Sequence, residues 1–201
     1  MNPLLPWPEM RQLAFSGGSI LFFGEAMSRL SAYMMGRFSL QGKSVLLVDA
    51  AQAFDPYLVA RMGRWQGVSA RLLLERIRLS RTFTCHQLAT LLCETLPGEK
   101  VNGPLIVLGP CSLFYDDQVA LKERLALFQK MTVSLRGLQE RGEGLYLFQP
   151  PLSRHVRKHY FGRYLAGSVR WVIRVSQGDK TLEGRLVQSG FEEKRLKEGR
   201  G

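Results

Sequence analysis

A chain of 201 residues with 45% hydrophobic content is long enough for one domain with a substantial core, which excludes global disorder. Its apolar runs have the length of strands, and no charged leader precedes an apolar stretch, so we expect a cytoplasmic protein without a secretory signal or a membrane span. The net charge is +11, and twelve Lys/Arg against five Asp/Glu from Pro151 onward place +7 of it in the last quarter. This asymmetry favours a polyanionic partner, either nucleic acid or an anionic surface, while composition alone leaves simple solubility charge equally open.

The chain begins with a segment that differs in composition from the rest. Three prolines surround Trp7 ahead of the glycine pair at 17–18. We predict an N-terminal arm over residues 1–17, suited to docking on a partner. Residues 18–190 are predicted to form one core domain because no linker-like stretch divides them. The charged sequence 191–201 is predicted to be a flexible tail.

The core region alternates apolar runs with amphipathic periodic segments. The runs are predicted to be buried strands, and the third is wetter because charged residues interrupt it. Asp55 before Pro56, and Thr84 before the next periodic segment, have the residue types of helix N-caps. In chain order we predict strands at 19–23, 43–50, within 71–83, at 104–110 and at 144–151, and helices at 28–40, from Pro56 onward, at 84–96 and at 118–141.

This alternation defines the expected fold class. Apolar strands separated by amphipathic helices indicate an α/β protein with a mainly parallel, twisted sheet and helices on both faces. After Pro151 the apolar period changes to two, over residues 168–191 around the turn Gln177-Gly178-Asp179. This period predicts an antiparallel hairpin at the C-terminal end of the domain, added at the edge of the sheet.

Six pieces of the chain occur in a family-like order: "GSILFFGEAMSRLS", "VLLVDAAQAFDPYLVARM", "RIRLSRTFTCHQLATLL", "PLIVLGPCSLF", "LYLFQP" and "SVRWVIRV…GRLVQS". Together they resemble the RecA-type recombinase ATPase core, a P-loop NTPase-type fold, over about residues 18–188. In that resemblance the first piece corresponds to the strand and phosphate loop, the fourth to the magnesium strand, and the fifth to the strand that ends in a sensor glutamine. A shared fold does not fix a shared function.

The residues that the family uses for nucleotide chemistry are mostly replaced. A phosphate loop requires G-x-x-x-x-G-K-[ST], in which backbone N–H groups and the lysine hold phosphates and the hydroxyl holds magnesium. The magnesium aspartate and the catalytic glutamate of the family are also missing, whereas the sensor glutamine is present. The corresponding positions, which define a degenerate nucleotide site with degenerate Walker A and Walker B motifs, are Gly24, Arg29, Leu30, Ser31, Ala51, Gly109 and Gln149.

These losses predict that the chain is not an enzyme. They affect the phosphate clamp, the metal site and the group that activates water, and electrostatic positioning supplies most of phosphoryl-transfer catalysis. We therefore expect no ATP hydrolysis, no cofactor and no metal site. One alternative stays open, namely a rearranged nucleotide site in which Arg29 or Lys43 supplies the cation.

A basic and aromatic segment follows the sensor glutamine, where the resemblance implies a DNA-contacting loop. Cations hold phosphates and aromatic rings stack on unpaired bases, a combination that suits single-stranded DNA. The alternative is a solvated basic loop whose aromatic rings pack on the sheet. The candidate DNA-binding residues are Arg154, Arg157, Lys158, His159, Tyr160, Arg163, Tyr164 and Arg170.

Two other patterns have simpler explanations. The acidic pair Asp116-Asp117 stands where the resemblance implies a second DNA loop, and we interpret it as a charge pair at a helix N-terminus. Cys85 and His86 are adjacent on a predicted helix, where their side chains should point about 100° apart and make a poor nucleophilic pair. We therefore predict a catalytically inactive RecA-like accessory factor in recombination or DNA repair that binds DNA, or alternatively a subunit that pairs with an active RecA-family ATPase, or regulates its filament, without binding DNA.

Overall fold

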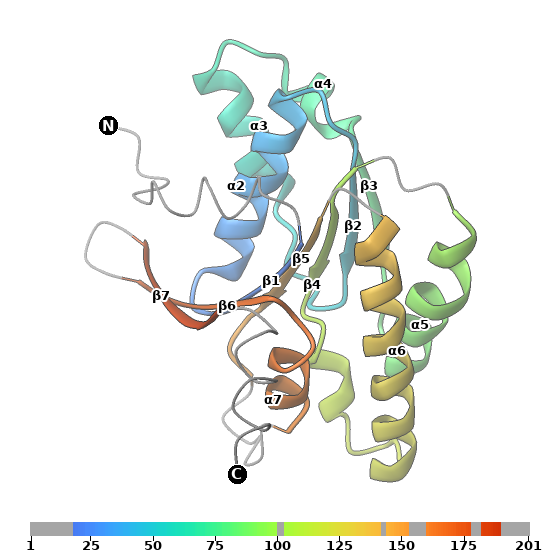
Figure 1. Ribbon diagram of the computed structural model, residues 1–201. Helices are drawn as coiled ribbons and strands as arrows, with labels where there is room; N and C mark the ends of the chain where they lie inside the picture. The colour runs from blue at the N-terminus through green and yellow to red at the C-terminus, as the bar shows by residue number, and fades with distance from the viewer. Residues whose placement is uncertain (1–17, 100–102, 142–143, 153–159, 178–181, 190–201) are drawn as a thin grey trace.

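The described part of the chain folds around one sheet that helices cover on both faces (Figure 1). The predicted arm at 1–17 and tail at 191–201 lie outside the described residues. The computed structural model describes residues 18–99, 103–141, 144–152, 160–177 and 182–189.

The sheet has the strand order β3-β2-β4-β5-β1-β6-β7 within the described residues. All neighbouring strands pair in parallel except β6 and β7, which are antiparallel. The predicted mainly parallel α/β fold with a C-terminal antiparallel hairpin is therefore confirmed. The strands are β1 Ser19–Gly24, β2 Val45–Asp49, β3 Ile77–Arg81, β4 Leu105–Leu108, β5 Leu145–Gln149, β6 Trp171–Gln177 and β7 Leu182–Ser189.

Helices lie on both faces of the sheet (Figure 1). On each face a layer of buried apolar side chains packs between the helices and the sheet. One layer packs β1, β2, β4 and β5 against α2 Met27–Leu40, α3 Pro56–Trp65 and α4 Ala70–Leu74. The opposite layer packs the same strands against α5 Cys85–Thr90, α6 Leu121–Arg141 and α7 Tyr160–Ala166. Short turns of other helix types lie at Leu91–Thr95, Leu96–Gly98 and Ser112–Tyr115.

The helix starts follow the capping chemistry of the sequence. The Asp55 side chain accepts a hydrogen bond from Tyr57 N at 2.9 Å, with Pro56 at the first helical position. The Thr84 side chain accepts from Gln87 N at 3.2 Å at the start of α5. Both predicted N-caps are confirmed, and each satisfies a backbone donor that the helix itself leaves unpaired.

The strand burial follows position in the sheet. β2, β4 and β5 are buried along their whole length, because each has a strand on both sides and helices on both faces. β3 lies at one edge of the sheet and is largely exposed, which confirms the prediction of a wetter third strand. The leucine-rich run that precedes β3 folds as the short helix α4.

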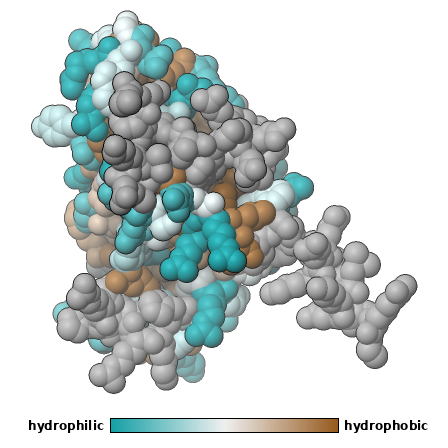
Figure 2. All heavy atoms as spheres, turned by 90° about the vertical axis from the view of Figure 1, so that its left-hand side faces the viewer, coloured by the Kyte–Doolittle hydropathy of each residue, from teal (hydrophilic) through white to brown (hydrophobic). Residues whose placement is uncertain are grey.

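The hairpin extends the sheet beyond β1. β6 pairs in parallel with β1, and β7 pairs with β6 through a register shift between Val172 and Ile173. Of the predicted turn Gln177-Gly178-Asp179, Gln177 is the last residue of β6, and the other two residues lie outside the described residues. This end of the sheet faces the viewer in Figure 2, where hydrophilic and hydrophobic side chains lie next to each other. The exposed Leu186 and Val187 of β7 contribute hydrophobic surface at this edge.

The chain crosses the sheet in both directions. From β1 it passes through α2 to β2, and from β5 it passes through α7 to β6 on the opposite face. Open parallel sheets place ligands at the carboxyl ends of the strands where such crossovers diverge. A ligand-binding site is therefore expected at the carboxyl ends of β1, β2, β4 and β5.

Candidate functional site

The turn after β1 is short and is hydrogen-bonded to β6. Only Glu25 and Ala26 separate Gly24 from the first residue of α2. The backbone N–H of Glu25 donates to Val175 O at 3.1 Å, and the Glu25 carboxylate accepts from Gln177 N at 3.0 Å. A Cβ on Gly24, whose φ is +122°, would lie 2.1 Å from Val175 O. The close approach of β6 accounts for the glycine without any phosphate.

The other phosphate-loop positions lie inside helix α2. Leu30 is 2% exposed and belongs to the apolar core, and its N–H donates to Ala26 O at 3.0 Å. Ser31 is fully buried, and its hydroxyl donates to Ser28 O at 3.0 Å. Arg29 is half-buried beside them. The position of the lysine is thus filled by a core leucine, and the hydroxyl that would bind magnesium is used within the helix.

The remaining positions of the degenerate site meet at the carboxyl edge of the sheet. Gly109, directly after β4, has φ +78°, and a Cβ there would lie 2.6 Å from Ala51 Cβ and 2.9 Å from Ala51 N. This contact leaves no room at residue 109 for the magnesium aspartate. The amide of Gln149 is 7% exposed and fully used: its Oε1 accepts from Cys111 N at 2.8 Å, and its Nε2 donates to Pro150 O at 2.8 Å. Gln149 therefore holds the loop after β4.

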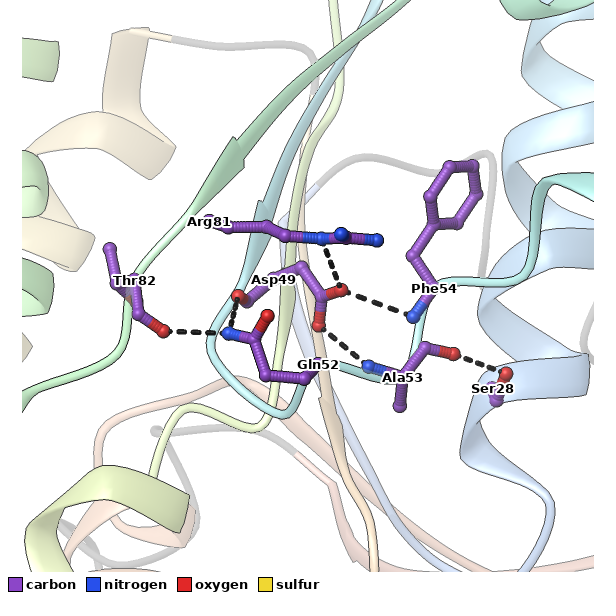
Figure 3. A network of polar contacts seen from close by, with 7 residues as sticks. All are labelled: Ser28, Asp49, Gln52, Ala53, Phe54, Arg81 and Thr82. Carbon is purple, nitrogen blue, oxygen red and sulfur yellow. Dashed lines mark hydrogen bonds and ion pairs between the residues drawn. The ribbon is translucent and has the colours of Figure 1, made fainter.

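A buried carboxylate that sequence reasoning did not single out ends strand β2. The Asp49 side chain is fully buried, and its two oxygens accept from Ala53 N and Phe54 N, each at 3.1 Å (Figure 3). Arg81, at the end of β3, brings its Nε to 3.6 Å from the same carboxylate. The only sequence signal was an acidic residue at the end of an apolar run, and its partner Arg81 comes within reach only when β2 and β3 pair.

Neighbouring contacts extend this network to both sides. Gln52, with φ +55°, donates from Nε2 to Asp49 O at 3.2 Å and to Thr82 O at 2.8 Å (Figure 3). On the other side the Ser28 hydroxyl donates to Ala53 O, which joins the loop to α2. The loop that would carry a catalytic glutamate is thus held by structural hydrogen bonds.

The Asp49→Asn variant should be less stable than the wild type by roughly 2 kcal/mol. An amide offers one oxygen in place of two, so one buried backbone N–H loses its acceptor, and Arg81 loses its ionic partner. Chemical denaturation followed by circular dichroism measures the loss. Asp117→Asn is the matched control, because Asp117 is 99% exposed and should change stability by no more than about 0.5 kcal/mol. Equal midpoints for the two variants would contradict this role of Asp49.

Helix α7 presents the described part of the predicted DNA-binding segment. Tyr160, Arg163 and Tyr164 are spaced i, i+3 and i+4 and are exposed, the two rings by 41% and 47%. Phe161 and Leu165 on the opposite side of α7 are buried in the core. Arg154, Arg157, Lys158 and His159 lie outside the described residues. Arg170 is exposed just before β6, with its guanidinium over the Trp171 ring at 5.5 Å.

The acidic pair lies in the turn that precedes α6. Asp116 accepts from Gln118 N at 3.0 Å, and Asp117 lies 3.6 Å from the Arg124 guanidinium. Because α6 begins only at Leu121, the two carboxylates order the approach to the helix and do not lie in its first turn.

An apolar pocket of about 510 Å³ lies at the carboxyl ends of β1 and β5, on the face that carries α7. Arg163 is the one cation among the described residues that line it, and Gln149 supplies an amide. Triphosphates require several cations or backbone donors, so this pocket suits an apolar group. Its lining includes Leu21, Phe23, Pro150, Leu165, Val172 and Val187.

The Cys85-His86 pair has an unexpected geometry. Cys85 Sγ lies 3.7 Å from His86 Nδ1, and His86 Nε2 lies 2.8 Å from the Glu123 carboxylate. The expectation that the two side chains would point apart is therefore wrong, because Glu123 turns the imidazole back toward the thiol. Burial nevertheless raises the pKa of the Cys85 thiol, and its 1% exposure leaves a substrate no access.

No protein-family model matches the sequence, and no curated protein matches it either. The fold places the chain in the class of α/β proteins, with a mostly parallel sheet that ends in an antiparallel hairpin. None of the described helices combines the length and apolar character needed to cross a membrane. The described residues also contain no group of three His, Cys, Asp or Glu side chains placed to hold a metal ion.

Proposed function

We propose that this chain is a catalytically inactive RecA-like protein that acts as a DNA-binding accessory factor in recombination or DNA repair. The RecA-like part is supported by the parallel sheet, the opposed crossovers and the closing hairpin. Gly24 and Gln149 end strands β1 and β5, and Gly109 directly follows β4, so these corresponding positions lie at the carboxyl edge of that sheet. The inactive part is supported by what fills the degenerate nucleotide site, namely a buried leucine at residue 30 and a contact between Gly109 and Ala51.

The outer face of α7 is the observation that carries the DNA-binding part. Arg163 lies between two exposed tyrosines on one side of the helix, and Arg170 follows before β6. Exposed rings can stack on unpaired bases, while the guanidinium groups neutralise phosphates. Because Tyr160 and Tyr164 are exposed, their rings are only partly packed on the protein. A base-stacking surface requires such accessible rings.

A titration with labelled oligothymidine, followed by fluorescence anisotropy at two salt concentrations, tests this proposal. Tyr164→Ala should weaken binding roughly 5- to 150-fold, because each stacked base contributes about 1–3 kcal/mol. Arg163→Ala should weaken binding and lower the slope of log K against log salt by about one. Both side chains are exposed, so neither substitution should change the unfolding midpoint appreciably.

Lys130→Ala is the matched control for charge. Lys130 is exposed on α6, where its ammonium lies 2.9 Å from Glu94, so its removal changes the net charge equally without altering the α7 face. We expect DNA affinity within about twofold of wild type. Binding that is independent of salt, or a loss on Lys130→Ala equal to that on Arg163→Ala, would rule out α7 as the contact.

A second candidate function is an interaction subunit that pairs with an active RecA-family ATPase, or regulates its filament, without binding DNA. The observation that favours it is the acidic turn at the carboxyl edge, where Asp117 is 99% exposed and would repel phosphate. Under this alternative the chain should fail to bind oligothymidine yet co-purify with the active ATPase and alter its rate of ATP hydrolysis. These two measurements separate the functions.

A further inference from the structure

The outer face of α3 carries a second set of arginines and aromatic rings. Four exposed residues occupy positions i, i+4, i+7 and i+8 of the helix, which bring them to one side. The opposite side packs against α2 and α4: Met62 meets Gly36 of α2, and Gly63 meets the backbone of α4. The exposed residues, called the α3 stripe below, are Tyr57, Arg61, Arg64 and Trp65.

The stripe is strongly exposed and positively charged. The Tyr57 side chain is 82% exposed and Trp65 is 51% exposed. The Arg61 guanidinium lies over the Trp65 ring, 5.2 Å from its centroid, so a cation and an aromatic face are already held together. Helix α3 contains no Asp or Glu, and within the described residues neither arginine forms an ion pair with a carboxylate.

The arrangement distinguishes between two kinds of partner. A helix that docks in the groove of a protein uses apolar anchors at i, i+3 or i+4, and i+7. In the stripe the positions between the two aromatic rings are Arg61 and Arg64, so no continuous apolar row is present. Two rings with two cations between them on one side of a helix instead match a flexible chain of stacked bases and phosphates. The net charge of +11 on the whole chain also attracts a polyanion such as DNA.

We propose that the α3 stripe is a second contact for single-stranded DNA. This inference rests on the proposed function, in which α7 makes the first contact. The two helices cover opposite faces of the sheet, and α3 starts at the carboxyl end of β2 while α7 follows β5. One strand of DNA reaches both by passing over the carboxyl edge of the sheet. Two linked contacts on one DNA strand bind far more tightly than either alone.

The test uses four full-length proteins and a labelled oligothymidine of about 24 nucleotides, longer than the roughly 4–16 nucleotides that a single OB fold, a common single-strand-binding domain, occupies. They are wild type, the α3 variant Tyr57→Ala/Trp65→Ala, the α7 variant Arg163→Ala/Tyr164→Ala, and the combination of all four substitutions. The α3 variant should weaken binding roughly tenfold or more. Tyr57→Phe/Trp65→Phe should restore the affinity, because phenyl rings still stack.

Two controls separate DNA contact from damage to the fold. All four side chains are exposed, so thermal unfolding should show that each protein folds as the wild type does. Leu72→Ala removes an exposed apolar side chain from α4, 54% exposed, without removing a ring or a charge, and should leave affinity unchanged.

The affinities of the four proteins show whether the α7 contact, the α3 contact or both are wrong. If the α7 variant binds like wild type and the α3 variant is weakened, the first contact is wrong and the second stands. If only the α7 variant is weakened, the proposed function stands and the α3 inference is overturned. An unchanged affinity of the α3 variant is also the result expected if the stripe docks an acidic protein, and it rejects the DNA contact. Equal losses with Leu72→Ala would likewise reject it.

Discussion

Gly24→Ala should be less stable than the wild type by about 3 kcal/mol or more. A methyl group at this residue would lie 2.1 Å from the carbonyl oxygen of Val175, which is backbone and cannot rotate away. The backbone also has φ +122°, a conformation that residues with a Cβ adopt only under strain. Strands β1 and β6 would have to separate, and overpacking of this kind costs at least 1–3 kcal/mol of a total stability of roughly 5–15 kcal/mol.

Substitutions at two other glycines distinguish the cost of the steric clash from the cost of the backbone strain. Gly67 has φ +66°, and no atom lies within 4 Å of the place that a methyl group would take, so Gly67→Ala should lose only about 1 kcal/mol from backbone strain. Gly98 has neither feature, and Gly98→Ala should be close to neutral. Urea unfolding followed by circular dichroism gives all three values. If Gly24→Ala is as stable as Gly67→Ala, then β6 does not approach β1 as closely as described.

Leu30→Lys should destabilise the protein by about 4 kcal/mol and should not create an ATP site. The substitution places the lysine of a phosphate loop at the corresponding position, but the side chain there is 2% exposed among apolar neighbours. Loss of a buried leucine costs about 2–5 kcal/mol, and an ammonium group that reaches into the core adds a desolvation cost. In this variant the turn after β1 would still have only two residues and be hydrogen-bonded to β6, so it would remain shorter than a phosphate-binding loop.

Leu30→Met is the volume-conserving control and should lose less than about 1.5 kcal/mol. Isothermal titration with ATP and magnesium, beside a denaturation curve, measures both parts of the prediction. Wild-type protein should release phosphate from ATP no faster than a Ser31→Ala variant, since the Ser31 hydroxyl already donates to Ser28 O. A stable Leu30→Lys protein that binds ATP would show that the loop after β1 can open.

The course of the main chain could be predicted from the sequence because the signals are local. Asp55 before Pro56, and Thr84 three residues before Gln87, specify helix starts through hydrogen bonds that span two or three residues. The apolar runs of β2, β4 and β5 specify strands buried on both faces. Residue types alone also show that Leu30 and Gly109 carry no charge at the positions where the resemblance implies a phosphate-binding lysine and a magnesium-binding aspartate.

The contacts that Gly24 and Gln149 make were not visible in the sequence. Gly24 matched the first glycine of a phosphate loop, yet its role here is to admit the carbonyl of Val175, which lies far along the chain on β6. Gln149 matched a sensor residue, yet its amide oxygen holds the N–H of Cys111. Such contacts depend on which strands become neighbours, and the spacing of residues along the chain does not encode that order by itself.

The sequence alone therefore determined the alternation of strands and helices, the hairpin, the strong positive charge and the absence of the charges that hold a triphosphate, since each depends on residue type and short-range periodicity. Only the tertiary structure decided that Asp49 is a buried anchor between β2 and β3, because its partners include Arg81 from a neighbouring strand. It also decided that the Tyr57 and Trp65 side of α3 faces solvent, because packing against α2 and α4 selects which side of an amphipathic helix is covered.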